Sequence, residues 1–104
     1  MNKAILIGET LGDITEIDLD ISPEKNEIYK LLKGKGTFIG QWPDIDVFIM
    51  KSKTLGLEIN NNILQKPFDT EITHGPILLI RMDENSEPQD FTLEESTLCL
   101  LEQP

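Results

Sequence analysis

One stretch in the middle of the chain has residue types that could bind an anion: Lys33-Gly34-Lys35-Gly36. Lysine ammonium groups beside flexible glycines can surround a phosphate. The stretch does not have the spacing of a P-loop, however, and it comes before an expected strand instead of an expected helix. Because glycine is the usual residue just past a helix end, the sequence favours a helix end here and leaves phosphate binding as the alternative.

The side chains that most often perform catalysis or bind metals are scarce. His74 is the only histidine and Cys99 is the only cysteine, and Asp69 forms no motif with either. A reactive cysteine needs a nearby base and an electropositive setting, whereas Cys99 belongs to an acidic tail. We therefore expect His74 to lie in a turn and Cys99 on the apolar side of a terminal helix. We expect no enzyme activity, no metal and no cofactor.

Three carboxylates recur at every second position: Glu16, Asp18 and Asp20. Side chains two residues apart on a strand share one face and lie about 6.6 Å apart. Such a row of anions could imitate a nucleic-acid backbone. The alternative is a solvated strand face that keeps the protein soluble.

The composition is that of a soluble globular chain: 104 residues, 38% hydrophobic and 27% charged, with a formal net charge of −10. The acidic excess disfavours direct binding to nucleic acid, although residues 23–53 carry six basic and four acidic residues. No signal peptide or membrane-spanning run is expected. A single cysteine excludes an internal disulfide and favours an intracellular location.

Apolar spacing predicts a single α+β domain over residues 1–104, with a mostly antiparallel sheet of about five strands and two helices in the order ββαβββα. Ser22-Pro23-Glu24 is typical of a helix start, so we expect a helix over residues 23–33 with Ser22 as its cap. Thr92 and Glu95 have the spacing of a capping box before a terminal helix. The expected strands are 3–8, 15–21, 37–42, 46–51 and 76–80, with a short edge pairing at 57–59.

The most continuous apolar run extends from Pro76 to Ile80. A short apolar run bounded by turn residues is typical of a strand that is buried on both faces. We expect the two faces to be formed by alternate residues, Ile77 and Leu79 on one side and Leu78 and Ile80 on the other.

Two turn-rich segments carry large aromatic side chains beside proline, Trp42 before Pro43 and Phe68 after Pro67. Exposed tryptophan often anchors an interface, whereas core packing is the more frequent fate of aromatic residues. We expect the two segments to form one binding surface at one end of the sheet. Its candidate residues are Gln41, Trp42, Pro43, Asp44, Asn60, Asn61, Asn62, Lys66, Pro67 and Phe68.

Four motifs in order resemble a family of small uncharacterised proteins that are encoded by large DNA viruses, notably viruses of algae. They are Gly40-Gln41-Trp42-Pro43-Asp44, Leu64-Gln65-Lys66-Pro67-Phe68, Gly75 to Asp83, and Asp90-Phe91-Thr92-Leu93. The resemblance covers about residues 36–95. Members often have a second proline where this chain has Lys66. The resemblance implies a viral source and supplies no catalytic residues, since the family has no established activity.

We therefore expect a small non-enzymatic protein that binds a host or viral protein, either inside an infected cell (in its cytoplasm or nucleus) or in the virion. We expect no direct contact with nucleic acid or membrane, and the oligomeric state stays open. One alternative is a nucleic-acid mimic that blocks a DNA- or RNA-binding protein. Another is a pocket for a small nucleotide-like ligand that uses Lys35, Lys51 and Trp42.

Overall fold

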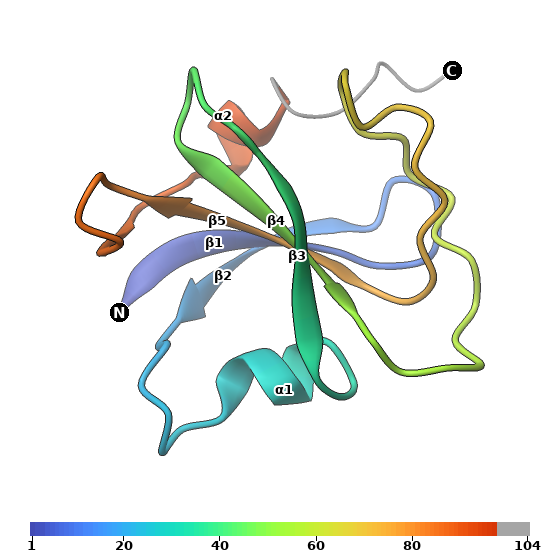
Figure 1. Cartoon of the computed structure of the whole chain (residues 1–104), viewed down its shortest axis with the longest axis horizontal. Coiled ribbons are helices and arrows are strands. Elements are labelled where there is room, and N and C mark those ends of the chain that lie inside the picture. The colour runs from blue at the N-terminus through green and yellow to red at the C-terminus, as the bar shows by residue number, and fades with distance from the viewer. Residues whose placement is uncertain (98–104) are drawn as a thin grey trace.

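The computed structural model describes residues 1–97, and within that range the chain forms six strands and two short helices. Their bounds are β1 (Asn2–Ile7), β2 (Ile14–Leu19), α1 (Glu27–Leu31), β3 (Gly36–Trp42), β4 (Val47–Ser52), β5 (Ile77–Met82), β6 (Pro88–Gln89) and α2 (Leu93–Ser96). The strands form one antiparallel sheet in the order β2-β1-β5-β4-β3, with β6 paired to β5 (Figure 1). The predicted α+β class is confirmed.

The central strand is β5, as its apolar run predicts. It pairs with β1 on one side and with β4 on the other. Ile77, Leu78, Leu79 and Ile80 are all buried. Ile77 and Leu79 belong to one hydrophobic cluster and Leu78 and Ile80 to a second. Alternate residues therefore face opposite sides of the sheet, which confirms the prediction for this strand.

The two hydrophobic clusters are covered by different parts of the chain. Leu64, from the long segment 53–76, and Phe91 complete the first cluster. Leu32, which follows α1, completes the second. In Figure 1, α1 lies below the sheet and segment 53–76 runs along the right-hand side. Each face of the sheet is thus closed by a short helix or a loop.

The first helix is shorter than the predicted range 23–33, and the prediction that Ser22 caps it is wrong. The main-chain N–H of Ser22 donates to Oδ1 of Asp20 over 2.9 Å, and that of Lys25 donates to the carbonyl oxygen of Ser22 over 3.0 Å. Asn26 follows with a φ of 55° and is the N-cap residue, without a side-chain capping bond. These local bonds compete with helical geometry, so the helix begins only at Glu27.

The start of α2, near the C-terminal end of the described chain, agrees with the capping box predicted from the sequence. The hydroxyl of Thr92 accepts a hydrogen bond from the main-chain N–H of Glu95, and the Glu95 carboxylate accepts one from the N–H of Thr92, both over 3.3 Å. The predicted capping box is therefore confirmed at the start of α2. Cys99, placed by the sequence on the apolar side of this helix, lies outside the described residues.

Candidate functional site

The two segments predicted to form a binding surface do meet, and they meet through Trp42 and Phe68. Their rings lie 5.6 Å apart in an edge-to-face arrangement, and Trp42 Nε1 donates to the carbonyl oxygen of Lys66 over 3.1 Å. Gly40 leaves room for the Phe68 ring, which a Cβ atom at that position would overlap. The Trp42 side chain is only 8% exposed and belongs to the first hydrophobic cluster. The sequence left open whether this indole is exposed as an interface anchor or packed in the core, and the structure shows it packed in the core.

Two of the three asparagines of the predicted surface, Asn60 and Asn62, form hydrogen bonds with other parts of the protein. Asn60 Nδ2 donates to the carbonyl oxygens of Ile7 and Gly75 over 3.3 and 3.0 Å. Asn62 Nδ2 donates to those of Gly8 and Thr10, both over 3.0 Å. Both side chains are buried. Asn60 fastens segment 53–76 to the end of β1, and Asn62 fastens it to the turn that follows. These bonds shape the loop and occupy the side-chain amides, which are then not available to a binding partner.

The remaining candidates of the predicted surface stay accessible. Pro43, Asp44, Asn61, Lys66 and Pro67 are exposed, and Gln41 and Phe68 are half-buried. The accessible part therefore consists of prolines and polar side chains with a partly exposed Phe68, and it lacks an exposed tryptophan.

The acidic row along β2 is engaged by the protein itself. Lys3 Nζ lies 2.7 Å from Asp18 Oδ1, and the main-chain N–H of Leu93 donates to Glu16 Oε1 over 2.9 Å. Asp20 lies past the end of β2, where its hydrogen bonding with Ser22 lowers the pKa of its carboxyl group. The three carboxylates do not form a regular free row, so this geometry gives no support to nucleic-acid mimicry.

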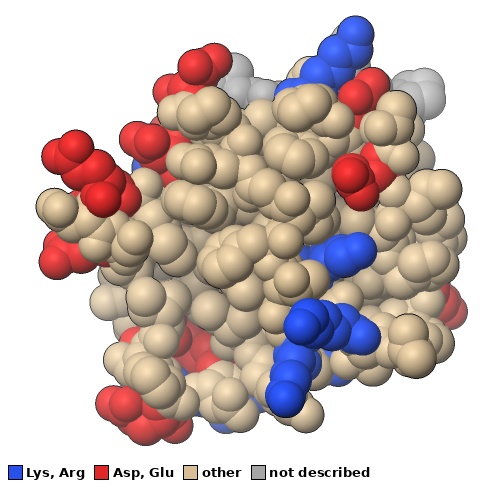
Figure 2. Space-filling view, in the orientation of Figure 1, with Lys and Arg blue, Asp and Glu red and all other residues tan. Residues whose placement is uncertain are grey.

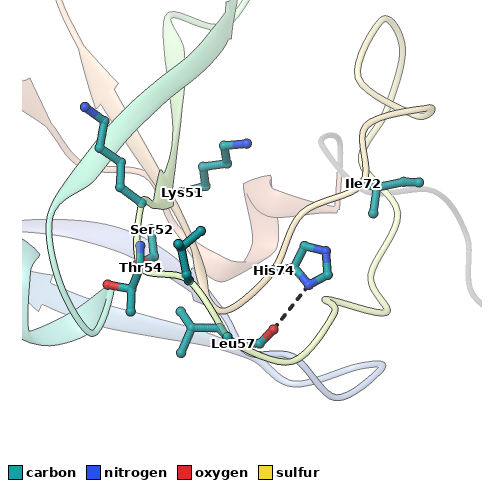
Figure 3. A pocket seen from close by; sticks show the side chains of 9 residues that line it. Lys51, Ser52, Thr54, Leu57, Ile72 and His74 are labelled. Atoms are coloured by element: carbon teal, nitrogen blue, oxygen red, sulfur yellow. Dashed lines mark hydrogen bonds between the residues drawn. The ribbon is translucent and has the colours of Figure 1, made fainter.

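A large open hollow of about 660 Å³ lies where β4 runs into segment 53–76. Lys51, Ser52 and Leu57 lie on the outgoing chain, and Ile72 and His74 come from the part of the segment that returns toward β5 (Figure 3). The remaining lining residues are Lys53, Thr54, Leu55 and Gly56. Its volume is within the usual range of ligand pockets.

The apolar rim of the large hollow is unusually exposed. Leu55 is 94% exposed and Ile72 is 69% exposed. His74 Nδ1 lies 3.2 Å from the carbonyl oxygen of Leu57, which can only accept, so Nδ1 carries a proton in this arrangement. The other ring nitrogen, Nε2, points away from that bond (Figure 3). The predicted edge pairing at 57–59 is present as one bridge between Ile59 and His74, and it brings the two sides of the hollow together.

A smaller hollow of about 440 Å³ adjoins the large one and is strongly basic. Its lining consists of Tyr29, Lys33, Gly34, Lys35, Lys53 and Thr54, and it shares the last two residues with the large hollow. Figure 2 shows basic side chains gathered where β4 ends, while many of the acidic side chains lie toward the margins of that face. Within the described part of the chain, Lys35, Lys51 and Lys53 have no ion-pair partner.

Pairing between β3 and β4 brings these lysines close together. Gly36 pairs with Ser52, and Lys53 continues the register by donating its main-chain N–H to the carbonyl oxygen of Lys35 over 2.7 Å. The Thr54 hydroxyl donates to the carbonyl oxygen of Lys33 over 2.8 Å and fixes the turn after α1. The sequence signals for this site were the basic excess of residues 23–53 and the stretch Lys33-Gly34-Lys35-Gly36, whose first three residues line the small hollow. Leu55 and Ile72 gave none, because neither stands in a recognisable motif.

The residues of the predicted nucleotide-like pocket do not share one site. Lys51 lines the large hollow, Lys35 lines the small one, and Trp42 lines neither.

Within residues 1–97 no group of three or more His, Cys, Asp or Glu side chains could hold a metal ion. In the same range no helix has the length and apolarity needed to cross a membrane.

Comparison with known proteins places the chain in a family. Residues 5–98 match the family of unknown function DUF5880. The chain belongs to this family. The match includes every residue that lines the two hollows, so the hollows of this DUF5880 member lie within the shared domain. No curated protein and no solved structure matches the chain.

Proposed function

We propose that this DUF5880 member is a small non-enzymatic binding module, encoded by a large DNA virus, whose partner is a host or viral protein. The four motifs that resemble proteins of algal viruses support the viral source. Intracellular action, in the cytoplasm or nucleus of an infected cell or in the virion, follows from that source and from the single cysteine.

The observation that carries the proposal is the combination of apolar and basic side chains around the two hollows. Leu55 and Ile72 are exposed where the core does not use them, and Lys51 and Lys53 lie beside them on a chain with a net charge of −10. An exposed apolar patch with a polar, solvent-accessible rim is typical of a protein interaction site. The complementary partner is a protein segment with acidic residues around an apolar anchor.

The proposed binding surface, around the two hollows, therefore differs from the surface around Trp42 and Phe68 that the sequence suggested. Trp42 and Asn62 hold segment 53–76 in place, and the exposed far side of that segment makes the contact. Loops held on a rigid sheet are where binding residues usually lie.

The proposal is tested by capture of partners from cells of the natural host with three forms of the protein: wild type, Leu55→Asp and Leu11→Asp. Leu11 is 46% exposed in the turn between β1 and β2, lines neither hollow, and serves as the matched control. We expect a protein that binds the wild type and Leu11→Asp but is lost with Leu55→Asp. If every captured protein binds Leu55→Asp as well as it binds the wild type, this surface is not the interface.

A further inference from the structure

We propose that the small hollow binds a compact dianionic group, a phosphate monoester or free phosphate. The inference rests on the proposed function, because it names the group on the partner that this surface takes. The ligand chemistry is the same whether the phosphate is carried by a side chain of the partner or by a small molecule.

The first argument is the placement of two like charges on paired backbone positions, with no acidic partner for either in the described part of the chain. Lys35 and Lys53 are direct cross-strand neighbours at the open end of the β3–β4 pair, joined by the main-chain bond of 2.7 Å. Like charges directly opposite one another destabilise a sheet. An anion between them removes the repulsion, so this arrangement is favoured when a ligand is bound.

The second argument is the sum of charges around the hollow. Its lining contributes three positive charges, from Lys33, Lys35 and Lys53, and no Asp or Glu. Glu9 Oε2 lies 3.2 Å from Lys33 Nζ and neutralises one of these charges from outside the lining. Three minus one leaves +2. A phosphate monoester carries about −1.5 to −2 at pH 7 and balances that sum.

The third argument is the kind of cation present. Arginine forks bind both carboxylate and phosphate, and lysine also binds phosphate, as a point charge. The only arginine, Arg81, is bound to Glu95 and to the carbonyl oxygens of Ile45 and Asp90. The Tyr29 side chain is half-exposed in the lining, and its hydroxyl can donate a further hydrogen bond.

The turn that presents two of the lysines is held rigidly. Gly34 has a φ of 143°, which favours glycine, and any Cβ atom there would overlap the Thr54 hydroxyl. That hydroxyl already donates to the carbonyl oxygen of Lys33. The backbone around the lysines is thus fixed before a ligand arrives, which reduces the entropy lost on binding.

The test is a titration followed by amide NMR, at constant ionic strength, with two probes: inorganic phosphate and a short phosphoserine peptide. The variants are Lys53→Gln and, as the matched control, Lys66→Gln, since Lys66 is exposed and lines neither hollow. We expect saturable shifts at residues 33–36 and 53–54 with the wild type. Lys53→Gln should weaken binding about tenfold or more, as expected for one charged hydrogen bond, and Lys66→Gln should not.

The two probes distinguish the sources of the phosphate. Tighter binding of the peptide supports a phosphorylated partner, and equal binding supports a free phosphate compound. The absence of saturable shifts, or equal losses with both lysine variants, would overturn the inference. If partner capture still depends on Leu55 in that case, the proposed function stands and only the phosphate site fails. Phosphate binding without any Leu55-dependent partner would instead refute the protein-binding function.

Discussion

Lys53 donates its main-chain N–H to the carbonyl oxygen of Lys35 over 2.7 Å, and this bond sets two ammonium-bearing side chains opposite each other. Lys53→Glu replaces the repulsion by an attraction. We expect the free energy of unfolding to rise by about 0.2–1 kcal/mol, measured by urea denaturation at low salt, and the gain to shrink as salt is added. A destabilised variant would mean that the two side chains do not oppose each other.

Trp42 has the role of a core residue with one polar bond. Because its indole is buried against Phe68 and donates to the carbonyl oxygen of Lys66, Trp42→Ala should lower the free energy of unfolding by about 3–5 kcal/mol. Phe38→Ala, at a side chain that is 54% exposed, should lower it much less. Native tryptophan fluorescence should be blue-shifted and shielded from quenchers. A loss below about 1 kcal/mol for Trp42→Ala would place the indole on the surface.

Asn62 joins segment 53–76 to the turn between β1 and β2. Its side chain donates to two carbonyl oxygens, and its Oδ1 accepts the main-chain N–H of Gly12 over 2.9 Å. Asn62→Ala leaves these groups without their partner and should destabilise the protein by about 1–3 kcal/mol. Asn61→Ala, at the exposed neighbour, is the control and should have a smaller effect. Equal losses in thermal or denaturant melts would contradict the structural role of Asn62.

Glu95 makes the free energy of unfolding depend on pH, so that this free energy falls as the solution is acidified. Its hydrogen bond with Arg81, together with its capping bond to Thr92, lowers the pKa of the carboxyl group below the ordinary 4.5. The unfolded chain therefore binds the proton more readily, so the stabilisation is complete above pH 4.5 and is lost as the pH falls through the lowered pKa. The free energy of unfolding of Glu95→Gln should fall less steeply on acidification than that of the wild type.

The control for that measurement is Glu94→Gln. The Glu94 side chain is exposed and makes no ion pair with any residue in the described part of the chain. This variant should keep the wild-type acid dependence in denaturant melts between about pH 3 and pH 6. A Glu95→Gln curve parallel to the wild type would show that the bond to Arg81 does not persist in solution.

The sequence by itself determined the features that depend on near neighbours in the chain. The apolar run from Ile77 to Ile80 predicted a central strand with two buried faces, because a side-chain period of two is fixed by strand geometry. The capping box of Thr92 and Glu95 followed from a spacing of three residues. Two local predictions failed: the helix start, where the Asp20–Ser22 bond favoured a turn over the cap, and the end of the strand predicted over 15–21, which stops at Leu19.

Only the tertiary structure decided the fate of Trp42 and the location of the candidate site. Trp42 is buried because Lys66 and Phe68, more than twenty positions away, come to lie on it. The small hollow joins the end of α1 to the end of β4, and the large hollow joins the end of β4 to residues 72–74. Contacts at such separations depend on sheet pairing and loop packing. A single sequence shows the residue types that take part in them, and the fold determines which of those residues meet.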